Sequence, residues 1–129
     1  MSNWRVRGVR GATTVEENTI AAVTQSVDEL LNAIEHHNQL DAAEIVSVIF
    51  SATPDIDCSF PAQAARSRPH WQYVPLLDVQ QMDVSSSLER CIRILLHVNT
   101  PLTQQQIHHV YLRRAQRLRP DLCLTNYKI

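Results

Sequence analysis

The amino-acid sequence predicts an α+β fold, in which a mixed β-sheet is covered on one face by one long helix. Apolar, β-branched segments that fit strands outnumber the segments with helical periodicity. Only one amphipathic segment, which ends near residue 37, is long enough to cover a sheet. A single covering helix leaves the second face of the sheet bare, and we therefore expect an oligomer that buries this face.

The first predicted elements are a strand and this long helix. Residues 4–10 alternate in character, which predicts a strand, and Gly8 and Gly11, the two glycines of the chain, lie at its end. Glycine at such a place is typical of a bend or of a close backbone approach. The sequence TVEE follows as a capping box with Thr14 as N-cap, and it predicts a helix that continues to about His37.

The other elements are shorter, and each is indicated by a local pattern of apolar residues and breakers. The strongest of them is apolar and β-branched on both faces, which is typical of a buried strand. In chain order we predict a strand over 44–53, a short helix over 61–68, strands over 71–79 and 91–99, a helical turn opened by Thr103, and a strand or extended segment over 107–115, for which a helix is an alternative.

Composition limits the classes of protein to which the chain can belong. Its length predicts a single domain over residues 1–129, with a tail over about 117–129 that we expect to be flexible. The net charge of −1 argues against nucleic acid or a membrane as partner. No apolar run reaches the roughly 18 residues that span a bilayer, and no secretory signal is visible. The three cysteines are widely separated, which predicts neither a metal site nor disulfides and favours the cytoplasm.

Three arginines lie on or next to predicted strands and are the first candidates for a binding site. These are Arg10, Arg93 and Arg113, and Arg93 stands within the apolar run CIRILL. A buried arginine needs an anionic partner. The partner can be a core carboxylate, for which Asp78 is a candidate, or the anion of a bound ligand.

Asp78 is a charge within an apolar strand pattern, in the stretch PLLDVQQMD. It therefore needs either an arginine partner or a ligand. Because side chains alternate along a strand, Asp78 and Gln81 can line one site only if the chain turns after Val79. No nucleophile with an adjacent base, no glycine-rich phosphate loop and no C-x-x-C motif occurs. These residues predict an arginine-lined pocket for a small polyanion.

Several short motifs, in order along the chain, resemble those of the AroH-class chorismate mutases. They include RGVRGATTVEENT, IFSATPDID, FPAQAAR, WQYVP, QQMDV, CIRILLHV, HVYLRRA and LRPDL, which run from about Arg7 to Thr125. The resemblance implies a homotrimeric pseudo-α/β-barrel with active sites between subunits. It also implies the Claisen rearrangement of chorismate to prephenate in phenylalanine and tyrosine biosynthesis, without metal or organic cofactor.

The resemblance assigns roles to individual residues on one side of the site. Arg93 matches an arginine at the breaking ether oxygen, where a preorganised cation stabilises the transition state. Arg10 matches an arginine that binds a substrate carboxylate, with Gly8 and Gly11 letting its backbone bend toward the ligand. Tyr111 matches a tyrosine that hydrogen-bonds the same end of the substrate.

Other residues are implied to complete the site. Phe60 and Arg66 lie on a segment that reaches the neighbouring subunit's site, and Leu77 belongs to one wall of the pocket. Arg119 lies on a C-terminal tail that closes over the cleft in this family. Gln63 stands where the family pattern FPAKA has a lysine, so we expect weaker capture of the dianion.

The sharpest departure from the family concerns the carboxylate of the site. Gln81 stands where relatives commonly have a glutamate, and Asp78 stands where they are commonly neutral. We therefore hypothesise that Asp78 supplies the negative charge while Gln81 keeps a hydrogen bond to the substrate. The alternative is that Asp78 pairs with a nearby arginine. Two other functions remain open, a trimeric module that binds carboxylates without catalysis, and RNA binding through YLRRAQRLR, against which charge and aromatic content argue.

Overall fold

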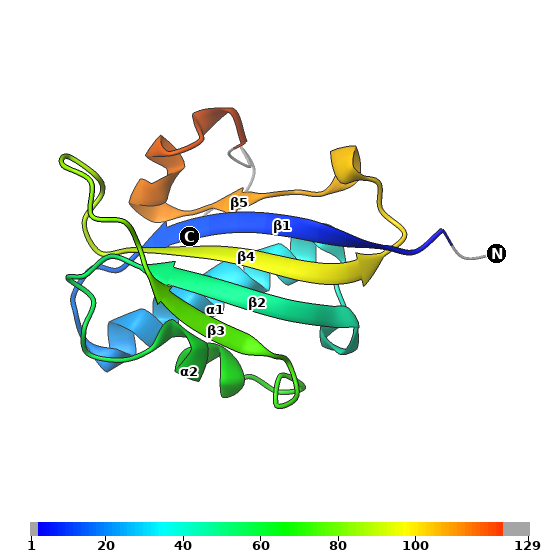
Figure 1. The fold of residues 1–129 in the computed structure, drawn as a ribbon, viewed down its shortest axis with the longest axis horizontal. Helices are drawn as coiled ribbons and strands as arrows, with labels where there is room; N and C mark the ends of the chain where they lie inside the picture. The colour runs from blue at the N-terminus through cyan, green and yellow to red at the C-terminus, as the bar shows by residue number, and fades with distance from the viewer. Residues whose placement is uncertain (1–2, 123–129) are drawn as a thin grey trace.

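A five-stranded mixed sheet in the order β3-β2-β4-β1-β5 forms the framework of the molecule (Figure 1). The structure is a computed structural model that describes residues 3–122. β4 pairs antiparallel with β1 and β2, whereas β2–β3 and β1–β5 are parallel pairs. The strands are β1 (Arg5–Thr14), β2 (Ile45–Ala52), β3 (Leu76–Gln80), β4 (Cys91–Thr100) and β5 (Val110–Tyr111).

One long helix covers one face of this sheet, as predicted. α1 (Ile20–Asn38) lies behind the sheet in Figure 1, and the short helix α2 (Pro61–Arg66) lies beside β3. From Val23 to Ile34, apolar residues of α1 recur every three or four positions and are buried. Short 3-10 helices complete the fold, namely η1 (Ala42–Glu44), η2 (Gln104–Gln106), η3 (Arg113–Arg117) and η4 (Pro120–Leu122). The predicted α+β class is therefore confirmed.

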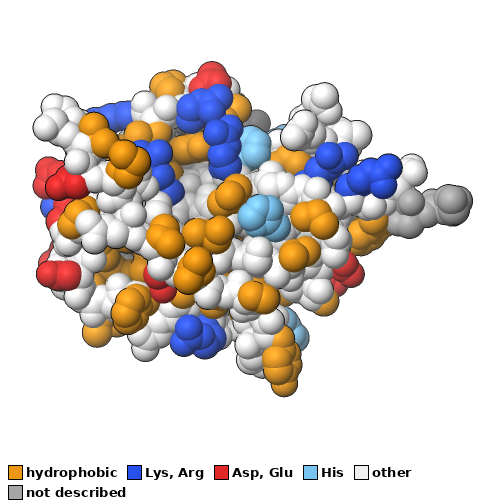
Figure 2. All heavy atoms as spheres, viewed as in Figure 1, with side chains coloured by type: hydrophobic (Ala, Val, Ile, Leu, Met, Phe, Trp, Pro, Cys, Tyr) orange, Lys and Arg blue, Asp and Glu red, His pale blue; other side chains and the backbone are white. Residues whose placement is uncertain are grey.

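The register of the strands sorts their side chains onto two faces. Phe50 pairs with Ile94 and with Asp78. Phe50 and Ile94 are buried in the core, on the face that α1 covers. Ser51, one residue later, pairs with Arg93 on the other face, which we call the open face. Leu77, Val79 and Leu95 are exposed on this face. Figure 2 shows apolar side chains, in orange, over the middle of the molecule.

The long helix begins five residues later than predicted. Its N-cap is Thr19, whose side chain accepts a hydrogen bond from the backbone of Ala22. Thr14, the predicted N-cap, is instead the last residue of β1, fully buried and paired with Cys91. The prediction failed because strand pairing with β4 extends β1 past residue 10, and a capping-box sequence does not reveal such a long-range partner.

Two other predicted strands are shorter than expected. β3 begins only at Leu76, because residues 71–74 form turns in which Trp71 is buried in the core. The segment 107–115 contributes only the two residues of β5, after which the chain turns into η3. The predicted strand over 44–53, the predicted helix beginning at Pro61 and the helical turn capped by Thr103 are confirmed within a residue or two.

Part of the predicted flexible tail lies outside the described residues. The tail from residue 117 to residue 122 holds the end of η3 and all of η4, and residues 123–129 are not described. Within residues 3–122, no helix is long and apolar enough to cross a membrane.

Candidate functional site

A pocket of about 230 Å³ lies on the open face, where β1, β4, β2 and β5 meet. Its wall contains the side chains of Arg10, Arg93 and Tyr111, together with Ser51 and apolar residues of the central strands. Figure 2 shows a hollow on this face with Lys and Arg side chains (blue) at its margin. This volume is below the roughly 300–1,000 Å³ of most small-molecule sites.

Arg93 is the most informative cation of this pocket. Its Nε atom is buried and has no hydrogen-bond partner within residues 3–122. Its guanidinium lies near the thiol of Cys91, whose pKa is raised by burial although the charge of Arg93 opposes this effect. A buried guanidinium nitrogen without a partner is costly in a protein interior, so Arg93 can still donate to an acceptor on a ligand.

Arg10 and Tyr111 are brought together by the parallel contact of β1 and β5. Gly11 pairs with Val110, and a Cβ atom on Gly11 would lie 2.7 Å from the carbonyl oxygen of Val110. The close approach predicted for Gly11 is therefore real and holds β5 against β1. Gly8 is different, because a Cβ atom there would make only an ordinary contact with Leu95, 3.7 Å away. The expected contribution of Gly8 to the site is not supported.

Gln81 lies on the same side of the sheet as Arg93. The hydroxyl of Ser51, which pairs with Arg93 across the strands, donates a hydrogen bond to Oε1 of Gln81 at 2.7 Å. The backbone N–H of Gln81 also bonds the carbonyl of Ala52 at 2.9 Å, where the chain leaves β3. Because its oxygen accepts from Ser51, the amide has its NH₂ group left to offer to a ligand.

Asp78 lies on the opposite face, in a second pocket of about 440 Å³. Its Oδ1 accepts a hydrogen bond from the backbone of Ala62 at 3.0 Å, at the start of α2. Burial raises the pKa of Asp78, although this hydrogen bond and the charge of Arg66 oppose the change. Phe60 is strongly exposed and lines the same pocket. This half-buried carboxylate therefore stands beside an exposed aromatic ring and a cation.

The alternative in which a core salt bridge joins Asp78 to a strand arginine is wrong for Arg93. The two side chains lie on opposite faces, since Asp78 pairs with Phe50 and Arg93 pairs with Ser51. Arg113, the third candidate arginine, does not line the pocket. It donates two hydrogen bonds of 2.9 Å to Glu29 on α1 and one of 3.1 Å to Glu16. Its role is to tie η3 to the helix.

The remaining predicted site residues occupy three separate places. Leu77 is exposed on the open face at the edge strand β3. Gln63 and Arg66 are exposed on α2, and the charge of Arg66 acts on Asp78 in the second pocket. Arg119 forms an ion pair with Asp121 at 2.8 Å, and its charge lies near Tyr111. One chain therefore does not bring all of these residues into a single pocket.

Sequence reasoning overlooked two polar side chains near the pocket. Ser51 belongs to an apolar strand pattern, and only its register with Arg93 reveals it. His109 accepts a hydrogen bond from the backbone N–H of Arg10 at 2.9 Å. The histidine pair 108–109 has no metal-ligand spacing, and this contact depends on the alignment of β1 and β5, which the sequence does not show.

A sequence profile described as chorismate mutase type I matches residues 6–122. The chain belongs to this family. It is 46% identical to the chorismate mutase AroH of Bacillus subtilis (strain 168) over 120 residues, which cover 93% of this chain and 94% of that protein. It is 47% identical to the chorismate mutase AroH of Thermus thermophilus over 118 residues, which cover 91% and 96%.

A solved structure agrees with this assignment. The chorismate mutase from Clostridium thermocellum superimposes with a TM-score of 0.82 at 41% identity, and the match covers 85% of this chain and 97% of that one. The family predicted from the motifs, and with it the chorismate mutase activity, is confirmed.

Proposed function

We propose that this enzyme rearranges chorismate to prephenate in the open-face pocket, with Arg93 at the breaking ether oxygen. The observation that carries this proposal is the buried Nε of Arg93, which has no partner within residues 3–122 although Arg10 and Tyr111 share its pocket. Arg10 binds a substrate carboxylate, and Tyr111 donates a hydrogen bond to the same end of the ligand.

The chemistry of the reaction fits the residues of this pocket. A Claisen rearrangement is intramolecular, so it needs no nucleophile and no obligatory proton transfer. The protein accelerates it by holding the flexible dianion in its reactive conformer. It also accelerates it by stabilising the charge that grows on the ether oxygen as the C–O bond breaks, which is the task of Arg93. One such preorganised donor is worth about 3–4 kcal/mol.

A neighbouring copy of the chain supplies the second wall of the site. Phe60, Asp78 and Arg66 gather around a pocket that shares no lining residue with the pocket of Arg93. A substrate that contacts both sets must therefore lie between two copies. The exposed apolar residues of the open face supply the contact surface, and the trimer implied by the motifs closes with three such sites. Leu77 belongs to this contact region.

The carboxylate that balances positive charge on the substrate ring is Asp78 from the neighbouring copy. Gln81 cannot supply it, because it is an amide whose oxygen already accepts from Ser51. Asp78 is half-buried, carries a raised pKa and has no ion pair within 4.0 Å among the described residues. Gln81 contributes a hydrogen bond through its NH₂ group. The carboxylate has thus moved from one wall of the cleft to the other.

The C-terminal segment contributes the last cation. Arg119 lies near Tyr111 and is held by Asp121 through two hydrogen bonds of 3.1 and 2.8 Å. An arginine fork suits a carboxylate of the substrate equally well. Arg119 therefore exchanges Asp121 for the substrate when the tail closes over the cleft.

We also infer that the protein acts in the cytoplasm. Cys58 and Cys91 are free thiols, which suits a reducing compartment. The two cysteines come from distant segments and take part in no disulfide within the described residues.

The proposal is tested by following the ultraviolet absorption of chorismate in the presence of the purified protein or of its Arg93→Ala variant. Sedimentation of the same preparations measures the assembly. We expect wild-type protein to consume chorismate as a trimer, and the variant to lose most of kcat. A protein that leaves chorismate unchanged would support the alternative of a carboxylate-binding module. A monomer that is fully active would exclude the shared site.

A further inference from the structure

His109 joins the two strands that carry the ligand-binding residues of the open-face pocket. The backbone N–H of Arg10, on β1, donates a hydrogen bond to Nδ1 of His109 at 2.9 Å. His109 directly precedes β5, which carries Tyr111. Arg10 and Tyr111 both line the pocket. The imidazole of His109 therefore links the backbone of Arg10 to the strand that carries Tyr111.

This bridge lengthens a very short ladder of backbone pairs. β5 pairs with β1 only at Gly11↔Val110 and Ala12↔Tyr111. Arg10 stands one residue before these pairs, and the ring nitrogen of His109 accepts the N–H that a longer strand would bond through a carbonyl. After Tyr111, the backbone N–H of Leu112 bonds the carbonyl of Ala12 at 2.9 Å, and that of Arg114 bonds the hydroxyl of Thr14 at 3.3 Å. The bond to His109 is the contact on the side before Tyr111, where it adds one hydrogen bond to a short ladder.

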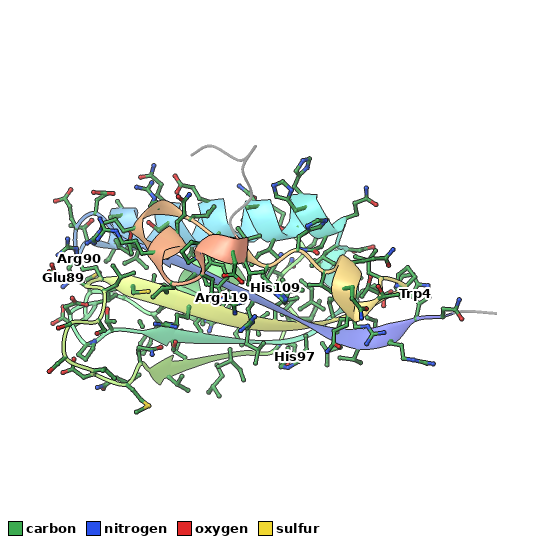
Figure 3. The ribbon with its side chains drawn as sticks, turned by 90° about the horizontal axis from the view of Figure 1, so that it is seen from above. Trp4, Glu89, Arg90, His97, His109 and Arg119 are labelled. Atoms are coloured by element: carbon green, nitrogen blue, oxygen red, sulfur yellow. The ribbon has the colours of Figure 1, made fainter. Side chains whose placement is uncertain are left out.

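The contact exists in only one protonation state of the ring. Nδ1 accepts a hydrogen bond only when it carries no proton, so His109 must be the neutral tautomer protonated at Nε2. Burial lowers the pKa of His109, and the charges of Arg10, Arg119 and His108 lower it further. These groups face it from β1, from the segment between η3 and η4, and from the adjacent residue. Figure 3 shows His109 and Arg119 near each other at this edge of the sheet.

The acidic group at this edge is already engaged. Asp121 on η4 pairs with Arg119 at 2.8 Å and is also influenced by the charge of Arg10. His109 is therefore surrounded by cations, of which Arg119 is paired with Asp121. Protonation of the ring would add a further positive charge, which is unfavourable. Near neutral pH the ring is neutral and accepts from Arg10.

We propose that His109 is a positioning residue, which in its neutral form fixes Arg10 beside Tyr111 for substrate binding and which weakens substrate capture when it becomes protonated. This inference rests on the proposed role of Arg10 in binding a substrate carboxylate. Because that role is one of binding, loss of the bridge raises KM more than it lowers kcat. The effect on kcat/KM is about two- to tenfold, as for one ordinary hydrogen bond.

The test compares the pH dependence of kcat/KM for chorismate in His109→Asn, His109→Ala and His108→Asn variants, from about pH 5 to 8. The Oδ1 atom of asparagine can accept the same N–H but does not titrate. We expect His109→Asn to keep wild-type activity at neutral pH and to lose it at a lower pH than wild type. His109→Ala loses about two- to tenfold at neutral pH through KM. His108→Asn, the control at the adjacent exposed position, keeps the wild-type KM at neutral pH. Because the charge of His108 no longer lowers the pKa of His109, its loss of activity in acid does not move below that of wild type.

Three results would overturn the inference. They are an acid profile of His109→Asn identical to that of wild type, a His109→Ala variant with unchanged KM, or a wild-type kcat/KM that rises on acidification. Should His109→Ala fail to fold by circular dichroism, the asparagine profile alone decides. An Arg93→Ala variant measured alongside separates this inference from the proposed function. If Arg93→Ala keeps full kcat, the proposed function is wrong, whereas loss of kcat with unaffected His109 variants refutes only the role of His109.

Discussion

Asp78 and Arg93 lie on opposite faces of one sheet, although their strands are separated only by β2. Asp78 shares its face with Phe50 and contacts α2, whereas Arg93 shares the open face with Ser51. Two groups so placed cannot contact one small molecule within one chain. In the proposed site, Asp78 therefore comes from a second copy of the chain.

Replacing Arg93 by alanine is expected to lower kcat by about a hundredfold to a thousandfold, because it removes the donor at the breaking bond. The melting temperature should not fall, since a buried nitrogen without a partner is removed with the side chain. Steady-state kinetics and thermal unfolding of one preparation measure both effects.

Arg113→Ala is the matched control for this variant. Arg113 bonds Glu29 and Glu16 and lies outside the pocket, so its loss should cost about 1–3 kcal/mol of stability and leave kcat unchanged. The assignment of Arg93 is wrong if Arg113→Ala lowers kcat while Arg93→Ala lowers only the stability.

Asp78→Asn is expected to lower kcat and kcat/KM together, by about tenfold to a hundredfold, because the charge acts in the transition state. Asparagine keeps an oxygen that can accept from Ala62, so the fold should be as stable as wild type or more so. Relocation of the carboxylate is wrong if Asp78→Asn has wild-type kinetics while Gln81→Glu raises the activity.

Activity and stability should respond differently to Asp78 in acid. The folded-state pKa of Asp78 lies above its ordinary value of 3.8, so the carboxylate becomes neutral on acidification earlier than an exposed aspartate does. Activity falls as the pH drops through that raised pKa. The contribution of Asp78 to stability does not fall there, because a carboxyl with a raised folded-state pKa favours folding when it is protonated.

The pH profiles of kcat and of the melting temperature, recorded for wild type and Asp78→Asn, check this expectation. The wild type should show an acid limb in kcat that the asparagine variant lacks. If kcat falls at the same pH in both proteins, the group that titrates is not Asp78.

Gly11→Ala is expected to displace β5 and to lower both stability and activity. The added Cβ would meet the backbone carbonyl of Val110 at 2.7 Å, and a backbone atom cannot move as a side chain does. A cost of about 1–3 kcal/mol is typical of such overpacking. Tyr111 moves with β5, so KM should rise.

Gly8→Ala is the control for this substitution. Its added Cβ has ordinary space beside Leu95, and alanine is not disfavoured over glycine in a strand. Thermal unfolding and KM of the two alanine variants distinguish the close approach at Gly11 from a general effect of losing a strand glycine. Equal effects would contradict the geometry described for β5.

Local patterns predicted the elements whose cause is local. Pro61 at the first position of α2, Thr103 before η2 and the β-branched run of β2 are each read from a few adjacent residues. The predicted start of the long helix was wrong because both Thr14 and Thr19 are residue types that can serve as a helix N-cap. Pairing of Thr14 with Cys91, far along the chain, decides between them.

The site was predictable in its residue types but not in its geometry. The motifs identified Arg93, Arg10 and Tyr111, and these three share one pocket. The faces of Asp78 and Gln81 depend on the register of β3 with β2 and on the turn after Gln80, which no local pattern reveals. The partner of Arg113 depends on α1, and the contact of His109 depends on β5, for the same reason.

The shared site is tested most directly by mixing two defective variants, Arg93→Ala and Asp78→Asn, and reassembling them from unfolded chains. If Arg93 and Asp78 meet across copies, roughly a quarter of the sites in randomly mixed trimers contain both wild-type residues. We predict that kcat per site then rises clearly above that of either variant alone. A mixture no more active than the average of the two separate variants would contradict a site built from two copies.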